Sequence, residues 1–327
     1  MIKKGITIII CTYNGVERLG QTLAHIARLT IPSHIKIELI LADNNSNDNS
    51  TDFAKEEWRN LAIPNIAFKA ISETKPGKLY ALQKAIYTAE YEYLIICDDD
   101  NWLAKNYLIR VFNNLENMPN IAAFGGFGVA VTDAVELPAW FKDYHYAYAV
   151  GSQSKAEGIM KQGSVLWGAG LATRKTLYEE MYQNFPSIIP TSKFNILSAE
   201  DTEYCLRLAI KGYRLFYDSE MIYQHHIPKF KLTKKFLEEK LLRGFDNSRQ
   251  TLGKYYPAVR VYLKAKNRPV IWLYLFLSSC FRYLFFKGRR KIKAKDTLFH
   301  LLPFWIKSDP ISTKIKSFVK TNRIASR

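Results

Sequence analysis

The sequence has few cysteines and lacks the motifs of several common classes of protein. Its four cysteines, Cys11, Cys97, Cys205 and Cys280, lie far apart, and no pair has the spacing of a zinc or redox site. A disulfide framework is therefore not expected, and a reducing, cytoplasmic setting fits best. The chain contains neither Gly-x-Gly-x-x-Gly after its first apolar run nor Gly-x-x-x-x-Gly-Lys-Ser/Thr. These absences argue against a nicotinamide dehydrogenase and against a phosphate-loop ATPase.

Long apolar runs are also scarce. Residues 6–11 follow two lysines, but the run is too short for a signal peptide and no small-residue cleavage site follows it, so we interpret it as a strand. Residues 270–286 are strongly apolar and aromatic but include Arg282, and they fall short of the roughly 20 residues that a spanning helix needs. The segment could just span a membrane, but we expect it to lie in the plane of one or to pack on the domain.

Apolar runs alternate with segments of helical periodicity over the first hundred residues. We expect strands at residues 6–11, 37–42, 66–71 and 93–97, and helices at 17–29, 51–61 and 79–90. Further helices are expected at 106–116, 175–181 and 199–211, and strands at 121–132 and 215–223. This pattern predicts an α/β fold with a doubly wound, mostly parallel sheet flanked by helices.

Three consecutive carboxylates, Asp98, Asp99 and Asp100, follow the fourth expected strand. The carboxyl ends of parallel strands are where open α/β sheets place their ligands. Adjacent negative charges repel one another, and Mg²⁺ or Mn²⁺ carrying phosphates would hold them together. If the extended backbone continues, Asp98 and Asp100 share one face and Asp99 points away. The alternative is a solvated acidic turn.

Other polar residues stand at the ends of expected strands or the starts of expected helices. Asp43 ends the second strand, where a carboxylate binds a ribose or base in nucleotide folds or simply forms a turn. Lys78 begins a helix and could face a diphosphate, or could be a surface lysine. Asn14 follows the first strand. We expect Asn14, Asp43 and Asp98 to converge at one edge of the sheet.

Two later groups could take part in chemistry. Glu200 and Asp201 begin a helix, where acids are favoured by the dipole alone but could also act as a general base. His225 and His226 follow the last expected strand, and a neutral imidazole there could complete a metal site or be structural.

The ordered motifs over roughly residues 5–226 resemble those of family 2 glycosyltransferases. The segments that carry the resemblance are Ile8-Ile9-Ile10-Cys11-Thr12-Tyr13-Asn14, Leu41-Ala42-Asp43-Asn44-Asn45-Ser46, Lys75-Pro76-Gly77-Lys78, Asp98-Asp99-Asp100, Trp167-Gly168-Ala169-Gly170 and Glu200-Asp201. The resemblance implies a GT-A fold, a nucleotide-sugar donor that is UDP-linked, Mn²⁺ or Mg²⁺ as cofactor, and an inverting transfer of a hexosyl or N-acetylhexosaminyl group. The Gln-x-x-Arg-Trp segment of the processive synthases is missing, so we predict transfer of one sugar per acceptor encounter.

The resemblance also implies roles for single residues. Thr12, Tyr13 and Asn14 would line the nucleotide site, and Asp43 would hold the base. Lys78 would lie near the donor phosphates, Asp98 would contact the ribose, and Asp99 would support it.

The same resemblance implies a metal site and a general base. Asp100 would bind the metal, with His225 or His226 as a second ligand. Asp201 would be the general base that deprotonates the acceptor hydroxyl.

The net charge of +17 is concentrated in the last hundred residues. Residues 227–327 contain 25 Lys and Arg against 5 Asp and Glu, whereas residues 1–226 are close to neutral. We therefore predict a catalytic domain over 1–226 and a basic helical region over 227–327. Basic clusters beside apolar aromatics suit an anionic membrane surface. The alternative is that these helices pack on the domain and the charge is only solvated; a nucleic-acid partner is not expected, because no recognised module accompanies the charge.

Together these features predict a glycosyltransferase of cell-envelope polysaccharide synthesis, peripheral on the inner face of the membrane, acting on a glycan or lipid-linked acceptor. Two alternatives remain open. One is a metal-dependent nucleotidyltransferase, which would also use carboxylates and metal on an α/β sheet. The other is a protein that binds a sugar nucleotide or a membrane without catalysis.

Overall fold

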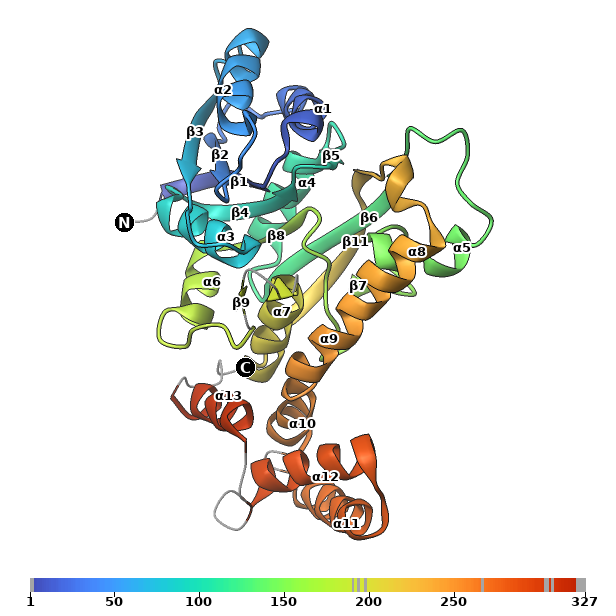
Figure 1. The fold of residues 1–327 in the computed structure, drawn as a ribbon. Coiled ribbons are helices and arrows are strands. Elements are labelled where there is room, and N and C mark those ends of the chain that lie inside the picture. The colour runs from blue at the N-terminus through green and yellow to red at the C-terminus, as the bar shows by residue number, and fades with distance from the viewer. Residues whose placement is uncertain are drawn as a thin grey trace.

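A nine-stranded sheet runs through the centre of the molecule (Figure 1). The computed structural model describes residues 3–189, 191–192, 195–196, 199–265, 268–302, 306 and 309–321. Within them the strand order is β3-β2-β1-β4-β8-β6-β11-β5, with β7 paired to β11. A separate two-stranded hairpin, β9 (Thr191–Ser192) and β10 (Asn195–Ile196), lies between α6 and α7 in the sequence.

The first half of the sheet is parallel, as the sequence predicts. Its strands are β1 (Lys3–Thr12), β2 (Ile37–Asp43), β3 (Ile66–Ser72) and β4 (Tyr91–Asp98). The connecting helices are α1 (Val16–Ala27), α2 (Ser50–Leu61) and α3 (Lys78–Thr88). Each of these elements overlaps the range expected from its apolar pattern, so the α/β prediction is confirmed.

The second half mixes strand directions. Its elements are β5 (Asn101–Leu103), α4 (Tyr107–Asn117), β6 (Ile121–Val131), α5 (Phe141–Tyr144), the 3-10 turn η1 (His145–Tyr148), β7 (Gly158–Ile159), β8 (Leu171–Arg174), α6 (Lys175–Tyr182), α7 (Glu200–Lys211) and β11 (Arg214–His226). β8 is antiparallel to both β4 and β6, and β5 is antiparallel to β11, while the long β6–β11 pairing is parallel. The last strand reaches His226, so both histidines belong to β11 rather than to a following loop.

The two faces of the sheet bury separate apolar cores because successive strand residues point to opposite sides. Ile8 and Ile10 pack with residues of α1, α2 and α4, whereas Ile9 and Cys11 pack with residues of α3, α6 and α7. Every apolar residue of β1 from Ile6 onward is buried, as expected for a strand covered on both faces.

The C-terminal helices begin beside the β6–β11 part of the sheet, and the later ones lie at the end of the molecule opposite α1 and α2 (Figure 1). They are η2 (Lys229–Lys231, a 3-10 turn), α8 (Lys234–Phe236), the π-helical η3 (Leu237–Leu242), α9 (Arg243–Leu252), α10 (Tyr255–Val259), the π-helical η4 (Arg260–Ala265), α11 (Pro269–Phe285), α12 (Gly288–Leu301) and α13 (Pro310–Thr321). Among the described residues, no helix is long and apolar enough to cross a membrane.

Two of these helices share the core of α7. Tyr255 of α10 and Phe318 of α13 are almost fully buried in the same apolar cluster as Leu208. By contrast, α11 and α12 pack on each other and on η4 around a smaller cluster. A division of the chain at residue 226 remains a prediction.

Buried hydrogen bonds fix α10 to α7. Arg207, 1% exposed, donates to Glu203 at 2.9 Å and to the Tyr255 hydroxyl at 3.0 Å. Tyr255 in turn donates to Glu203 at 2.8 Å. The guanidinium also donates to the backbone carbonyls of Met181, Phe185 and Pro186. All the charge on Arg207 is thus satisfied inside the protein, as a buried cation requires.

Candidate active site at the carboxyl edge of the sheet

Strand register aligns the ends of the parallel strands. Thr12 of β1 lies opposite Asp43 of β2, and Cys11 lies opposite Asp98 of β4. The polar residues that follow these strands therefore meet at one edge of the sheet, as the alternating pattern predicts.

The three consecutive carboxylates do not follow the strand alternation expected from the sequence. β4 ends at Asp98, and Asp99 and Asp100 form a turn before β5. Buried Asn101 supports this turn, since its side-chain oxygen accepts a hydrogen bond from the Asp98 N–H at 3.2 Å. Because the backbone turns, each carboxylate faces a different cation, and mutual repulsion is relieved separately at each one.

Asp99 is held by Arg18, the second residue after the start of α1. The guanidinium donates from Nε to Oδ1 at 3.0 Å and from Nη2 to Oδ2 at 2.8 Å, a bidentate pair. Thr12 donates its hydroxyl to Oδ2 at 2.6 Å, and Thr22 donates to the Asp99 carbonyl at 2.7 Å. Asp99 therefore fixes the turn to β1 and α1. Because the Thr12 hydroxyl is hydrogen-bonded to Asp99, its side chain stabilises the turn.

Asp100 meets His225 and Lys231. One carboxylate oxygen, Oδ2, lies 3.5 Å from His225 Nε2 and 3.3 Å from Lys231 Nζ. Burial opposes ionisation of Asp100, but His225 and Lys231 outweigh that effect and lower its pKa below the ordinary value. His226 instead stacks on Trp102, with ring centroids 5.2 Å apart. Of the two histidines, His225 is the one beside the carboxylate.

The pair formed by Asp100 and His225 suits a divalent cation. His225 Nδ1 lies 2.5 Å from the Tyr148 carbonyl oxygen, which can only accept, so Nδ1 carries the proton. Burial lowers the pKa of His225, but the Asp100 carboxylate outweighs that effect and raises it above the ordinary value, so the protonated ring faces Asp100 as a cation. When the ring is neutral, Nε2 instead carries a lone pair, and a divalent ion between the two groups would complete that arrangement. A backbone carbonyl behind the ring is also the usual support of a metal-bound histidine. In the described part of the chain no group of three or more such ligands gathers, and Mg²⁺ commonly takes one or two protein ligands with the rest from phosphate and water.

Lys78 lies between two carboxylates rather than alone. Its ammonium forms an ion pair with Asp98 and a second one, at 3.0 Å, with Glu200 of α7. Burial alone lowers the pKa of Lys78, but the charges of Asp98 and Glu200 raise it well above the ordinary value. The ammonium is therefore permanently charged and links α3, β4 and α7 at this edge.

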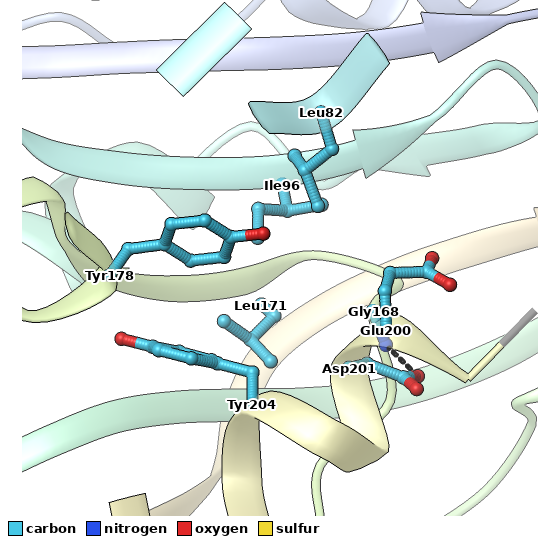
Figure 2. A pocket seen from close by; sticks show the side chains of 8 residues that line it. All are labelled: Leu82, Ile96, Gly168, Leu171, Tyr178, Glu200, Asp201 and Tyr204. Carbon is cyan, nitrogen blue, oxygen red and sulfur yellow. Dashed lines mark hydrogen bonds between the residues drawn. The ribbon is translucent and has the colours of Figure 1, made fainter. Parts of the chain in front are cut away.

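Asp201 is fixed at the start of α7. Its Oδ2 accepts a hydrogen bond from the backbone N–H of Gly168 at 2.8 Å (Figure 2). A methyl group on Gly168 would lie 3.6 Å from that oxygen and 3.7 Å from Lys78 Nζ, so all three groups border the same space. Glycine at this position keeps that space open between the carboxylate and the ammonium.

A small apolar pocket lies behind the carboxylates of α7. Figure 2 shows Tyr178 and Tyr204 at one end of it and Glu200 and Asp201 at the other. The remaining lining residues are Leu82, Ile96, Gly168 and Leu171. Burial raises the pKa of Asp201, and the neighbouring Glu200 carboxylate raises it further, to about 6. Asp201 can therefore be a base near neutral pH while remaining easier to protonate than an ordinary aspartate.

The β1–β2 side of the edge is polar, with Asp43 buried and Asn14 exposed. Asp43 accepts hydrogen bonds from Ser46, whose N–H lies 3.3 Å from both carboxylate oxygens. Asn14 has a left-handed backbone (φ 49°) and accepts from the Asn47 N–H at 2.8 Å. Tyr13 is 54% exposed. The Asp43 and Asn14 side chains are thus used in turns, and the roles predicted for them toward a nucleotide stay predictions.

Two residues at this edge were not expected from the sequence. Arg18 and Lys231 reach their carboxylates across 81 and 131 residues of chain. Arg18 lies one helical turn after Asn14, which is a weak local signal. Lys231 follows His225 by six residues in a lysine-rich stretch, where nothing distinguishes it from its neighbours.

Known proteins with similar folds bind nucleotide sugars. Residues 1–349 of Staphylococcus aureus TarS, solved in complex with UDP-GlcNAc, align with 91% of this chain and 71% of their own, at 15% identity and a TM-score of 0.51. The mannosyltransferase PcManGT from Pyrobaculum calidifontis, solved with GDP-Man and Mn²⁺, aligns with 92% of this chain and 88% of its own, at 16% identity and a TM-score of 0.53. At these identities the likeness shows the fold, which is the GT-A arrangement expected.

The sequence relatives are longer than this chain. Poly-beta-1,6-N-acetyl-D-glucosamine synthase of Staphylococcus aureus is 21% identical over 282 residues, which cover 84% of this chain and 64% of the relative. This chain thus spans under two thirds of the length of that relative. The sequence profile of glycosyl transferase family 2 matches residues 7–179, more than half of the chain. The chain therefore belongs to glycosyl transferase family 2.

Proposed function

We propose that the protein is a metal-dependent, inverting glycosyltransferase that moves a sugar from a nucleoside-diphosphate sugar to an acceptor hydroxyl. The observation that carries this proposal is the placement of Asp201. Its carboxylate stands at the same sheet edge as Lys78 and Asp98, oriented by the Gly168 N–H and with its pKa raised to about 6.

Asp201 would be the general base. As the acceptor oxygen attacks the anomeric carbon, its proton passes to the Asp201 carboxylate while the bond to the leaving diphosphate breaks. A single base with in-line attack inverts the anomeric configuration and forms no sugar–enzyme bond. Glu200 would keep Asp201 basic and hold Lys78 at the site.

Asp100 and His225 would hold Mn²⁺ or Mg²⁺. The ion, when bound, neutralises charge that develops on the leaving diphosphate. Asp98, paired with Lys78 at the end of β4, is the carboxylate we propose for the ribose, and Asp99 would keep that turn in place through Arg18. Asp43 and residues 12–14 would border the base of the nucleotide.

The donor we propose to test first is UDP-N-acetylglucosamine. The TarS structure holds that donor, and the Staphylococcus aureus relative is named as a synthase of an N-acetylglucosamine polymer. The acceptor would be a hydroxyl of a glycan or lipid-linked glycan in cell-envelope polysaccharide synthesis. Because the Gln-x-x-Arg-Trp segment is missing, we propose a single transfer per encounter.

Product analysis tests the reaction class. The purified protein is incubated with Mn²⁺ and a panel of nucleotide sugars, alone and with an envelope-glycan extract, and released nucleotide is quantified. Free nucleoside diphosphate is expected, because an inverting site leaks slowly to water. Release of pyrophosphate would identify a nucleotidyltransferase instead, and binding of donor without any turnover would identify a non-catalytic protein.

A base variant assigns the activity to this site. Asp201→Asn should lower transfer by about a hundredfold or more, the usual contribution of a general base. The matched control is Asp52→Asn, which removes an exposed carboxylate on α2. Full activity of Asp201→Asn would show that Asp201 is not the general base.

We also propose that the enzyme works while bound to the inner face of the membrane. The α11 face consists of apolar side chains that are each more than half exposed, namely Val270, Leu273, Tyr274, Leu277, Phe281, Leu284 and Phe285. These positions recur every three or four residues and so share one side of the helix. Exposed basic residues follow at once: Lys287, Arg289, Arg290, Lys291, Lys293 and Lys295.

An apolar face bordered by basic residues matches the two components of a bilayer surface. Its aromatic and aliphatic side chains would enter the acyl boundary, while each Lys or Arg near anionic headgroups contributes about 1 kcal/mol. This arrangement favours binding of α11 in the plane of the membrane surface.

A further inference from the structure

Lys231 makes a looser ion pair than the other cations at the sheet edge. Its ammonium lies 3.3 Å from Asp100, whereas Arg18 contacts Asp99 at 2.8 and 3.0 Å with two donors. Charge-assisted N–H···O bonds favour about 2.7–2.9 Å. The contact of Lys231 is therefore mainly coulombic and easily exchanged, while that of Arg18 is fixed.

The backbone of Lys231 is held more firmly than its side chain, whose one contact described above is the long ion pair with Asp100. The Tyr148 hydroxyl donates to the Lys231 carbonyl at 2.9 Å, and the Tyr148 carbonyl accepts from His225 Nδ1. A single residue thus positions both cationic partners of Asp100. The Lys231 side chain has four methylenes and is 27% exposed, so its ammonium can move by several ångströms while the turn η2 stays in place.

Asp100 cannot serve Lys231 and a metal ion equally well. Both Lys231 Nζ and His225 Nε2 approach the same oxygen, Oδ2. A divalent ion between Asp100 and His225 would place a double positive charge beside the ammonium and repel it. The phosphate oxygens of a bound donor would then offer the displaced ammonium a new negative partner.

We infer that Lys231 is a movable cation of the donor site, which neutralises Asp100 before metal binds and contacts the donor diphosphate afterwards. This inference rests on the proposed function, since it requires a nucleoside-diphosphate donor. According to this inference, Lys231 has two positions. Removing its charge should therefore strengthen the binding of metal and weaken the binding of nucleotide. A residue that only supported the fold would weaken both.

The test measures the two affinities separately with Lys231→Met. Mn²⁺ binding without nucleotide, followed by electron paramagnetic resonance, should become about tenfold tighter because a competing cation is gone. UDP binding at saturating Mn²⁺, followed by calorimetry, should become about tenfold weaker, the usual effect of losing one charged contact. Unchanged or weaker Mn²⁺ binding, or unchanged UDP binding, would overturn the inference.

Two further variants separate charge from fold. Lys229→Met removes an exposed lysine from the same turn and should leave both affinities within about twofold of wild type. Lys231→Arg keeps the positive charge and should restore UDP binding. If Lys229→Met weakened UDP binding as much as Lys231→Met, general surface charge would be responsible and the inference would fail. If wild-type protein bound no nucleoside diphosphate at all, the proposed donor class would fall with it, whereas normal UDP binding by Lys231→Met would remove the inference alone.

Discussion

Asp201 has two neighbours with opposite effects on its proton affinity. Glu200 raises its pKa and Lys78 lowers it, while burial raises it most. Because Glu200 and Lys78 are themselves an ion pair, the basicity of Asp201 depends on a contact between α3 and α7. A change at Glu200 is therefore expected to alter pH dependence as well as rate.

Transfer should require ionised Asp201, so kcat/KM should fall as the pH is lowered through about 6. Glu200→Gln removes a negative neighbour, which favours the ionised form, so the acid limb should move to lower pH. The measurement is a pH profile of nucleoside diphosphate release at saturating Mn²⁺. Glu179→Gln, on a different helix, is the control and should keep the limb of wild type. An upward shift in Glu200→Gln would contradict the assigned sign.

Arg18 compensates a carboxylate that is 8% exposed. Arg18→Met should lower the free energy of unfolding by about 2–3 kcal/mol at pH 8, since Asp99 is left charged and buried without its partner. Burial already raises the pKa of Asp99 despite Arg18, so the loss should be smaller at pH 5 than at pH 8, because acid favours the protonated carboxyl. Urea denaturation at both pH values measures this difference. Adding Asp99→Asn should recover part of the loss; no recovery would mean that Arg18 stabilises the fold through other contacts.

The sequence alone identified carboxylates at the sheet edge but not all of their partners. Asp98, Asp100 and Asp201 were recognisable because each follows an apolar run or begins a helix. Arg18 and Lys231 were not, because a contact across 81 or 131 residues depends on how the chain returns to the edge. The backbone turn after Asp98 was missed for a similar reason, since it depends on Asn101 and on the pairing of β5 with β11.

At the scale of elements, α7 joins the site to the C-terminal helices. Its first turn carries Asp201, and its later turns carry Arg207 and Lys211. Lys211 donates to the Phe318 carbonyl of α13 at 2.9 Å, and Arg207 donates to Tyr255 of α10. The helix that holds the proposed base is therefore fixed from behind by residues far along the chain.

Tyr255→Phe should lower the free energy of unfolding by about 1–2 kcal/mol, because Glu203 and Arg207 each lose a buried hydrogen bond. Chemical denaturation measures the change. The neighbouring Tyr256 is 42% exposed, and Tyr256→Phe should leave stability within about 0.5 kcal/mol. Equal effects of the two substitutions would show that the buried hydroxyl is not what matters.

Helices and strands with a strong local sequence pattern were predictable, whereas short strands that depend on pairing with a distant segment were not. The four parallel strands and helices α1–α4 follow from apolar runs and helical periodicity. β5, β7 and β8 are only three, two and four residues long, and each is a strand because of a partner elsewhere in the chain. The mixed direction of the second half of the sheet was missed along with them.

At the scale of the whole molecule, the α11 face gives a direct test of membrane binding. Wild-type protein should sediment with phosphatidylglycerol vesicles more than with phosphatidylcholine vesicles, and added salt should weaken binding. Leu277→Asp with Phe281→Asp should reduce binding at least about tenfold, since two apolar side chains can no longer enter the bilayer. Val135→Asp, on a fully exposed loop residue, should bind as wild type does. If the double substitution in α11 left vesicle binding unchanged, the protein would contact the membrane through another surface.

The position of α13 has a practical consequence for anyone who wants to shorten this protein. The chain leaves the core after α10, forms the α11–α12 hairpin, and returns to pack Phe318 against α7 and α10. Truncation after α10 would uncover Arg207 and Lys211 and damage the helix that carries Asp201. Excising residues 268–301 would remove the exposed apolar face of α11, but it would also remove the packing of α12 on α10 and the ion pair between Lys254 and Asp296. The α11–α12 segment is therefore an internal part of the chain that supports α10, not a dispensable tail.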